Sequence, residues 1–173
     1  MGVTVEKIER IKVDCLYGKK KHFNAADRKE RYHYRLGIPL IIINILTGSL
    51  LFKNIVSKQT GWLEYLPVGL AFVASFLTGF QTYFNFHKQV EGHRRIASRY
   101  LSIMKRLDRI QGYIADGLIK DTTFVKEMEA MAADIEKINK DAEQFPTSQK
   151  DYNKAQTGIE AGEEDYTERE LTI

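Results

Sequence analysis

The chain has 173 residues, with 26 Lys and Arg against 23 Asp and Glu, and a formal net charge of +3. Once the apolar segments described below are set aside, too few residues remain for a second globular domain of usual size. A single cysteine, Cys15, excludes an intramolecular disulfide framework and agrees with a reducing compartment.

The N-terminal segment, residues 1–35, is predicted to form amphipathic helices on the cytoplasmic side of a membrane. Ile8, Ile11 and Cys15 recur at helical spacing, with charged residues on the other faces. Gly18 is expected to break the helix that they form.

A second helix is expected to begin near Asn24, which is a good N-cap, with Asp27 three residues later as the acid of a capping box. It is predicted to run to the membrane surface. Pro39 either occupies the first turn of a new helix or kinks a continuous one, and we expect a break or bend there.

Two long uncharged segments dominate the chain. Residues 36–52 provide about 17 positions without a charge, the lower limit for crossing a bilayer, and residues 65–86 provide about 22. Only the short segment 53–64 joins them, and a spanning backbone in lipid must be helical or belong to a closed barrel. The sequence therefore predicts a two-helix transmembrane hairpin over residues 36–86.

The charges that flank the hairpin predict its orientation. Lys and Arg are frequent before the first span and after the second, whereas the connecting loop offers only Lys53 and Lys58. Because Lys and Arg near span ends stay cytoplasmic, both termini are expected inside and the loop outside. No secretory h-region precedes the hairpin, so the first span is expected to act as its own insertion signal.

Two runs of residues flank the hairpin in a specific order. The first is His22-Phe23-Asn24-Ala25-Ala26-Asp27-Arg28, followed by Arg31, His33 and Leu36-Gly37-Ile38-Pro39. The second comprises Gln81, Phe84, Asn85, Glu91, His93, Arg94, Ala97, Arg99, Tyr100 and Leu101. Together they resemble the SLATT family, the SMODS- and SLOG-associating two-transmembrane effector proteins of bacterial conflict systems, over nearly the whole chain.

The resemblance implies an antiphage effector of the bacterial inner membrane that responds to a nucleotide-type or infection-derived signal and permeabilises the membrane. The motif residues are then candidates for sensing that signal. They are Asn24, Asp27, Arg28, Arg31, His33, His93, Arg94, Arg99 and Tyr100.

After the second span, two heptad-like stripes predict a cytoplasmic antiparallel helical hairpin over residues 87–145. The first stripe is Ile96, Tyr100, Ile103, Leu107, Ile110 and Ile114. The second is Phe124, Met128, Met131, Ile135, Ile138, Ala142 and Phe145. Pro146 is expected to end the second helix, and residues 146–173 are predicted to form a short helix and an acidic disordered tail.

A polar stripe inside the second span has two interpretations. Small and hydroxyl residues allow membrane helices to pack closely and to hydrogen-bond, which is common. Alternatively, several copies place these residues around a water-filled pore, because a single hairpin cannot enclose water, and the heptads offer a means of assembly. The pore-lining candidates are Asn44, Thr47, Ser75, Thr78, Gln81, Thr82 and Asn85.

The cytoplasmic basic residues also leave two interpretations open. The run Lys19-Lys20-Lys21 is typical of contact with anionic lipid headgroups. The alternative is a phosphate-binding pocket that adds Arg28, Arg31, His93, Arg94 and Arg99. No phosphate-binding loop motif supports the second interpretation.

No metal, other cofactor or nucleic acid is expected. The four histidines, His22, His33, His87 and His93, lack the spacing of a metal motif. No nucleophile, base and acid can be assigned as a set, so the chain is not expected to be an enzyme.

The favoured hypothesis is a membrane effector that forms homo-oligomers and opens a pore in the lipid bilayer on a cytoplasmic cue, from a nucleotide second messenger or a partner sensor protein. The alternative is a membrane-anchored coiled-coil scaffold that recruits a cytoplasmic partner. A membrane-bound enzyme is a third possibility, for which the sequence reveals no pocket.

Overall fold

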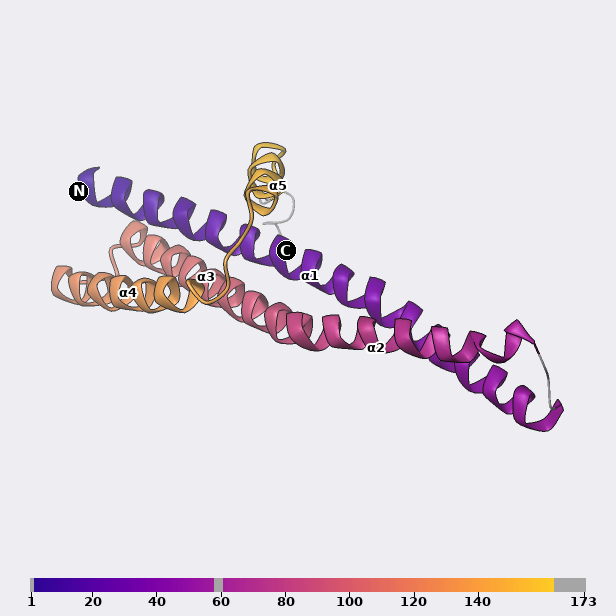
Figure 1. Cartoon of the computed structure of the whole chain (residues 1–173). Helices are drawn as coiled ribbons and strands as arrows, with labels where there is room; N and C mark the ends of the chain where they lie inside the picture. Colours follow the sequence, from indigo (N-terminus) through magenta and orange to yellow (C-terminus); the bar gives the residue numbers. More distant parts are fainter. Residues whose placement is uncertain (1, 58–60, 164–173) are drawn as a thin grey trace. The chain divides into compact units, whose positions relative to one another are not determined.

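The computed structural model describes the backbone of residues 2–57 and 61–163 and the side chains from Glu6 onward within these ranges. Its helices are α1 (Gly2–Ser57), α2 (Leu66–Phe84), α3 (Phe86–Ala115), α4 (Asp121–Ala142) and α5 (Gln149–Glu160), with a 3-10 turn, η1, at Trp62–Glu64 (Figure 1). No strand occurs in the described ranges, so the predicted all-α class is confirmed.

The chain divides into two compact units. We call residues 1–27 and 91–173 the core unit, and residues 28–90 the apolar unit. The helices α1 and α3 each contribute to both units.

Helix α1 is longer and less interrupted than expected. It passes through Gly18, Asn24 and Pro39 without ending, so the predicted break at Gly18 and the predicted N-cap at Asn24 are wrong, and no new helix starts at Pro39. A bend of the continuous helix at Pro39 stays a prediction. Gly18 is instead a close-packing position, because a Cβ atom there would lie 2.9 Å from the Tyr100 ring. The Asn24 amide donates a hydrogen bond to the Asp151 carbonyl at 3.1 Å and caps no helix.

Pro39 lies inside α1 rather than at a helix start. A proline removes one backbone donor, and in a membrane helix the freed carbonyl can be satisfied by neighbouring groups or local adjustment. The helix continues to Ser57 in spite of the missing donor.

The apolar unit exposes its hydrophobic side chains. The stretches Glu6–Ser57 and Trp62–Ala115 each contain an 18-residue window apolar enough to cross a membrane, of which only 6% and 11% is buried. A core helix of a soluble protein would bury most of such a window. The exposure predicts lipid contact and agrees with the two predicted apolar spans.

Helix α2 ends two residues before residue 86, the predicted end of the second span. Helix α2 stops at Phe84, and Asn85 follows in the left-handed conformation with φ 41° and ψ 53°. The Asn85 backbone N–H donates to the Gln81 carbonyl, which satisfies one of the last helical acceptors. Phe86, predicted to be the last residue of the span, begins α3 instead.

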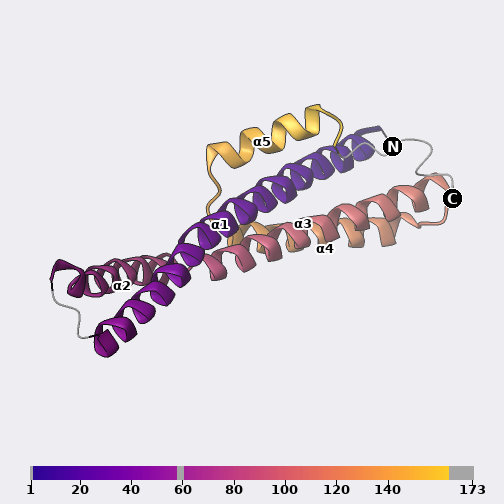
Figure 2. The same ribbon diagram turned by 90° about the vertical axis from the view of Figure 1, so that its right-hand side faces the viewer.

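The core unit is built around side chains from three helices. In both views α3 and α4 lie side by side (Figures 1 and 2). Every residue of the two predicted stripes belongs to the hydrophobic core or packs against it. Helix α1 adds Ile8 and Cys15, which are 0% and 1% exposed. Burial, with the nearby Asp14 carboxylate, raises the pKa of the Cys15 thiol to about 11.

Charged pairs lie at the edge of this core. Arg106 of α3 pairs with Glu127 of α4 at 2.6 Å and approaches Asp134 at 3.4 Å. Lys12 of α1 pairs with Asp108 of α3 at 2.5 Å. These partly exposed pairs contribute little energy each, and they favour one alignment of the three helices.

Helix α5 begins with a capping box in which Ser148 and Asp151 exchange side-chain and backbone hydrogen bonds. Its Ala155 is fully buried, and its Tyr152 ring stacks on Tyr17 of α1 with the centroids 5.6 Å apart. The predicted disordered tail largely falls in residues 164–173, which lie outside the described residues.

Candidate functional site

An open groove of about 970 Å³ lies between α1 and α2 in the apolar unit, and we call it the membrane groove. It brings together five of the seven residues predicted to line a pore, and their pore-lining role stays a prediction. These five are Asn44, Thr47, Ser75, Thr78 and Thr82. The remaining lining residues are Gly48, Leu51, Ala71, Ala74, Gly79 and Tyr83.

The hydroxyl groups of the membrane groove donate to their own helices. Thr47 donates to the Ile43 carbonyl at 2.7 Å, and Ser75 and Thr78 donate to the carbonyls four residues earlier at 2.8 Å each. Each hydroxyl oxygen keeps lone pairs that can accept a further hydrogen bond. None of the lining residues is charged. The groove therefore presents a neutral, weakly polar surface.

The glycines of this groove are not used for close helix packing within the chain. A Cβ atom at Gly48 or Gly79 would meet nothing within 4 Å. Small residues that serve a tight helix pair lie against the partner backbone, so a Cβ there would collide. The space in front of these glycines is open to lipid, to water or to another chain.

A smaller polar cavity of about 230 Å³ adjoins the groove and shares Thr78 and Thr82 with it. Here the Gln81 amide nitrogen lies 3.4 Å from Nδ1 of His33, and the His33 and His87 rings are 6.4 Å apart. Gln81 and Asn85, the other two predicted pore-lining residues, both line it. His33, predicted to sense a signal, thus lies among the pore candidates.

A buried histidine pair lies in the core unit. Nδ1 of His22 and Nδ1 of His93 are 3.0 Å apart, and the two residues are 2% and 1% exposed. Burial, reinforced by His93 and the charge of Lys21, lowers the pKa of His22 to about 4, against the opposing pull of Asp151. At neutral pH His22 is therefore uncharged, and one ring donates to the other.

Sequence reasoning missed this pair because 71 residues separate its members. Each histidine was judged by its neighbours in the sequence, and neither belongs to a motif that specifies a partner. Two signals were present in the sequence. Both histidines belong to the runs that resemble the SLATT family, and His93 lies one turn before the buried Ile96 and Ala97 on α3.

The remaining signal-sensing candidates are spread over several local interactions. Arg99 forms an ion pair with Asp141, and the Tyr100 hydroxyl donates to Asn139 Oδ1 at 2.6 Å. Asp27 and Arg94 are exposed. Arg28 and Arg31 belong to the apolar unit, whereas the lysine run, His93, Arg94 and Arg99 belong to the core unit, and the phosphate pocket stays a prediction.

These features define a class, the all-helical proteins with two apolar helices long enough to span a bilayer. A model of the SMODS and SLOG-associating 2TM effector domain family 4 matches residues 6–170, and the chain belongs to this family. The resemblance noted from the flanking motifs is thereby confirmed. Comparison with curated proteins and with solved structures gave no match.

Proposed function

We propose that this effector assembles into a homo-oligomer in the bacterial inner membrane and opens a pore when a cytoplasmic signal arrives, with both termini in the cytoplasm. The role is not enzymatic. The membrane groove carries the proposal, because it places neutral polar residues of both spans on one open surface. Such a surface can replace part of an ion's hydration without a fixed charge, so we expect weak ion selectivity.

Assembly is assigned to the apolar unit rather than to the heptad stripes. The stripe residues are used inside the chain, where Ile96 and Leu107 are fully buried in the hydrophobic core. They offer little surface to a second copy. The open space beside Gly48 and Gly79 is available for one, and small residues let membrane helices approach closely.

This distribution also weighs against the scaffold alternative. A coiled-coil scaffold needs an apolar seam that a partner can reach, whereas the described stripes are covered by the three helices of the core unit. Signalling is then a population shift, in which the signal must bind the open arrangement more tightly than the closed one.

The test is the membrane potential of cells, followed with a dye during induced expression and phage challenge. The wild type is expected to depolarise the membrane, and the double variant Thr78→Leu/Thr82→Leu is expected not to, because two leucines remove two of the polar lining residues and narrow the groove. Both proteins must be present at equal membrane levels.

The matched control is Ser49→Leu, which removes a hydroxyl from an exposed position of α1 that does not line the groove and that likewise donates four residues back. It is expected to depolarise like the wild type. Equal depolarisation by all three proteins would contradict the proposal that the membrane groove lines the pore. The absence of depolarisation by any of them would favour an anchoring role.

A further inference from the structure

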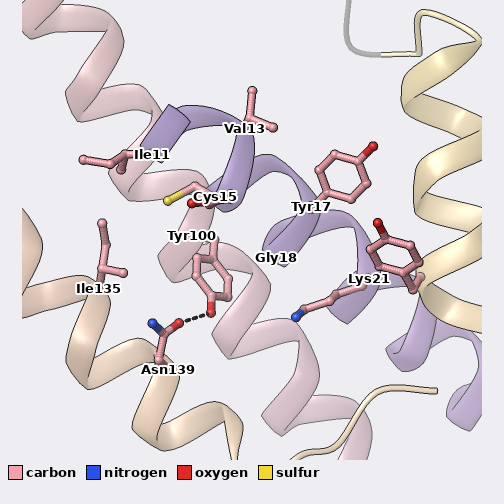
Figure 3. Close-up of a pocket in the computed structure, with 11 residues that line it drawn as sticks. Ile11, Val13, Cys15, Tyr17, Gly18, Lys21, Tyr100, Ile135 and Asn139 are labelled. Atoms are coloured by element: carbon pink, nitrogen blue, oxygen red, sulfur yellow. Dashed lines mark hydrogen bonds between the residues drawn. The ribbon is translucent and has the colours of Figure 1, made fainter. Parts of the chain in front are cut away.

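The core unit contains an open cavity of about 610 Å³ (Figure 3), which lies within the roughly 300–1,000 Å³ typical of small-molecule sites. Four helices contribute to it. Its lining residues are Ile11, Val13, Asp14, Cys15, Tyr17, Gly18 and Lys21 of α1, Tyr100 of α3, Ile135 and Asn139 of α4, and Tyr152 of α5.

Aromatic rings form two parts of its wall. Tyr17 and Tyr152 stack with an interplanar angle of 24°, and Tyr152 remains 41% exposed, so an outer ring face is available. The Tyr100 ring lies directly beneath Gly18, where only the missing Cβ atom allows the approach. Tyr100 is 6% exposed and closes the wall, whereas the stacked pair of Tyr17 and Tyr152 is the accessible aromatic surface. Flat aromatic faces of this kind bind planar rings by stacking.

The polar groups of the cavity provide more donors than acceptors. Lys21 extends from α1 toward the space beside the hydrogen bond between Tyr100 and Asn139 (Figure 3). Within the described ranges, no carboxylate forms an ion pair with Lys21. Asn139 uses Oδ1 to accept from Tyr100, which leaves its amide N–H groups for a ligand.

The charges of the lining residues narrow the class of ligand. Lys21 offers a cation to an anionic group, and Asp14, exposed among the lining residues, offers an acceptor to a ring amino group. A ligand that satisfies the cavity therefore combines a planar ring that carries hydrogen-bonding groups with a negative charge. Nucleotides combine these features.

We propose that this cavity binds a nucleotide, with the base against the stacked pair of Tyr17 and Tyr152 and a phosphate at Lys21. The inference rests on the proposed function, since the bound nucleotide is the cytoplasmic signal. The site lies among helices of the core unit and shares no residue with the membrane groove.

Equilibrium dialysis of the purified full-length protein in detergent micelles tests this proposal, with AMP, GMP, CMP and UMP and their 3′,5′-cyclic forms as probes. At least one probe is expected to bind. Lys21→Gln is expected to weaken it about tenfold, because a charge-assisted hydrogen bond to phosphate is lost. The matched control is Lys7→Gln, at an exposed position of the same helix outside the cavity, and it is expected to bind like the wild type.

A second pair of variants tests the aromatic wall. Tyr152→Leu is expected to weaken binding about tenfold by removing a stacking face, whereas Tyr152→Phe is expected to retain it. Circular dichroism of each variant identifies any that fails to fold. If Tyr152→Leu does not fold, the affinity of Tyr152→Phe is compared with that of the wild type.

Absence of binding by every probe at millimolar concentration would overturn the proposal. So would a bound probe whose affinity is the same in Lys21→Gln and in the wild type. If the wild-type protein depolarises the membrane but binds no probe, the nucleotide site is rejected and the proposed pore is retained. If binding depends on Lys21 but the wild-type protein does not depolarise the membrane, the proposed pore is rejected and the nucleotide site is retained.

Discussion

Replacing Gly92 by alanine is expected to lower the melting temperature by about 10 °C, equivalent to about 3 kcal/mol. Gly92 is a buried position of α3, and a Cβ atom there would lie 2.0 Å from the ring of Phe145. That ring packs against the hydrophobic core and meets the His93 ring with the centroids 5.9 Å apart. Either the ring or the helix must move, and both movements lose core contacts.

The matched control is Gly112→Ala, on the same helix. A Cβ atom there meets nothing within 4 Å, so alanine is expected to stabilise the protein by about 1 kcal/mol through its helix propensity. Thermal unfolding followed by circular dichroism in detergent micelles measures both effects.

The proposed collision also predicts non-additivity. In a Phe145→Ala background the ring is absent, so Gly92→Ala is expected to cost little beyond the Phe145→Ala change. An equal cost of Gly92→Ala in both backgrounds would show that the ring does not limit the space at Gly92.

Acidification is expected to destabilise the core unit through His22. Burial lowers its pKa to about 4 in the folded protein, against 6.5 for the ordinary side chain. Because the folded state favours the neutral ring, this contribution is fully present above pH 6.5 and is lost as the pH falls from 6.5 to about 4. A shift of this size corresponds to about 3 kcal/mol.

The variant His22→Gln isolates this contribution, since glutamine can hydrogen-bond to His93 and does not titrate. Melting temperatures measured from pH 7.5 to pH 4 are expected to fall less steeply for His22→Gln than for the wild type. His87→Gln, at an exposed histidine of the apolar unit, is expected to retain the steep fall. Parallel profiles for His22→Gln and the wild type would contradict the role of burial at this residue.

The sequence predicted those parts of the fold that depend on local periodicity. The spacing of Ile96, Tyr100 and Leu107 identified one face of α3, and these residues are buried. Period is a property of neighbouring residues, so it can be recognised without knowing the partner helix. The same reasoning placed Ser75 and Thr78 on one face of α2, and both residues line the membrane groove.

Predictions that depended on single residues were less successful. Gly18 and Asn24 carry the signals of a helix break and a helix start, yet both lie inside α1. Their actual roles, the approach of the Tyr100 ring and the hydrogen bond to Asp151, involve residues far along the chain. Tertiary contacts of this kind override local propensity and leave no periodic trace in the sequence.

The candidate cavity illustrates the same limit. Its lining residues come from four helices, and the stacked pair of Tyr17 and Tyr152 joins α1 to α5. Neither tyrosine lies in a motif. Lys21 was recognised only as part of a basic run, because its exposure to the cavity depends on the packing of α1 against α3 and α4.

The burial of Cys15 has a practical consequence for labelling chemistry. With a pKa of about 11, only about one thiol in ten thousand is ionised at neutral pH, and the residue is 1% exposed. Maleimides react with accessible thiolates, so Cys15 of the native protein is expected to react with them very slowly. Reporter cysteines can therefore be introduced one at a time along both spans of the otherwise unaltered chain, and their reaction rates before and after activation would map which positions water reaches.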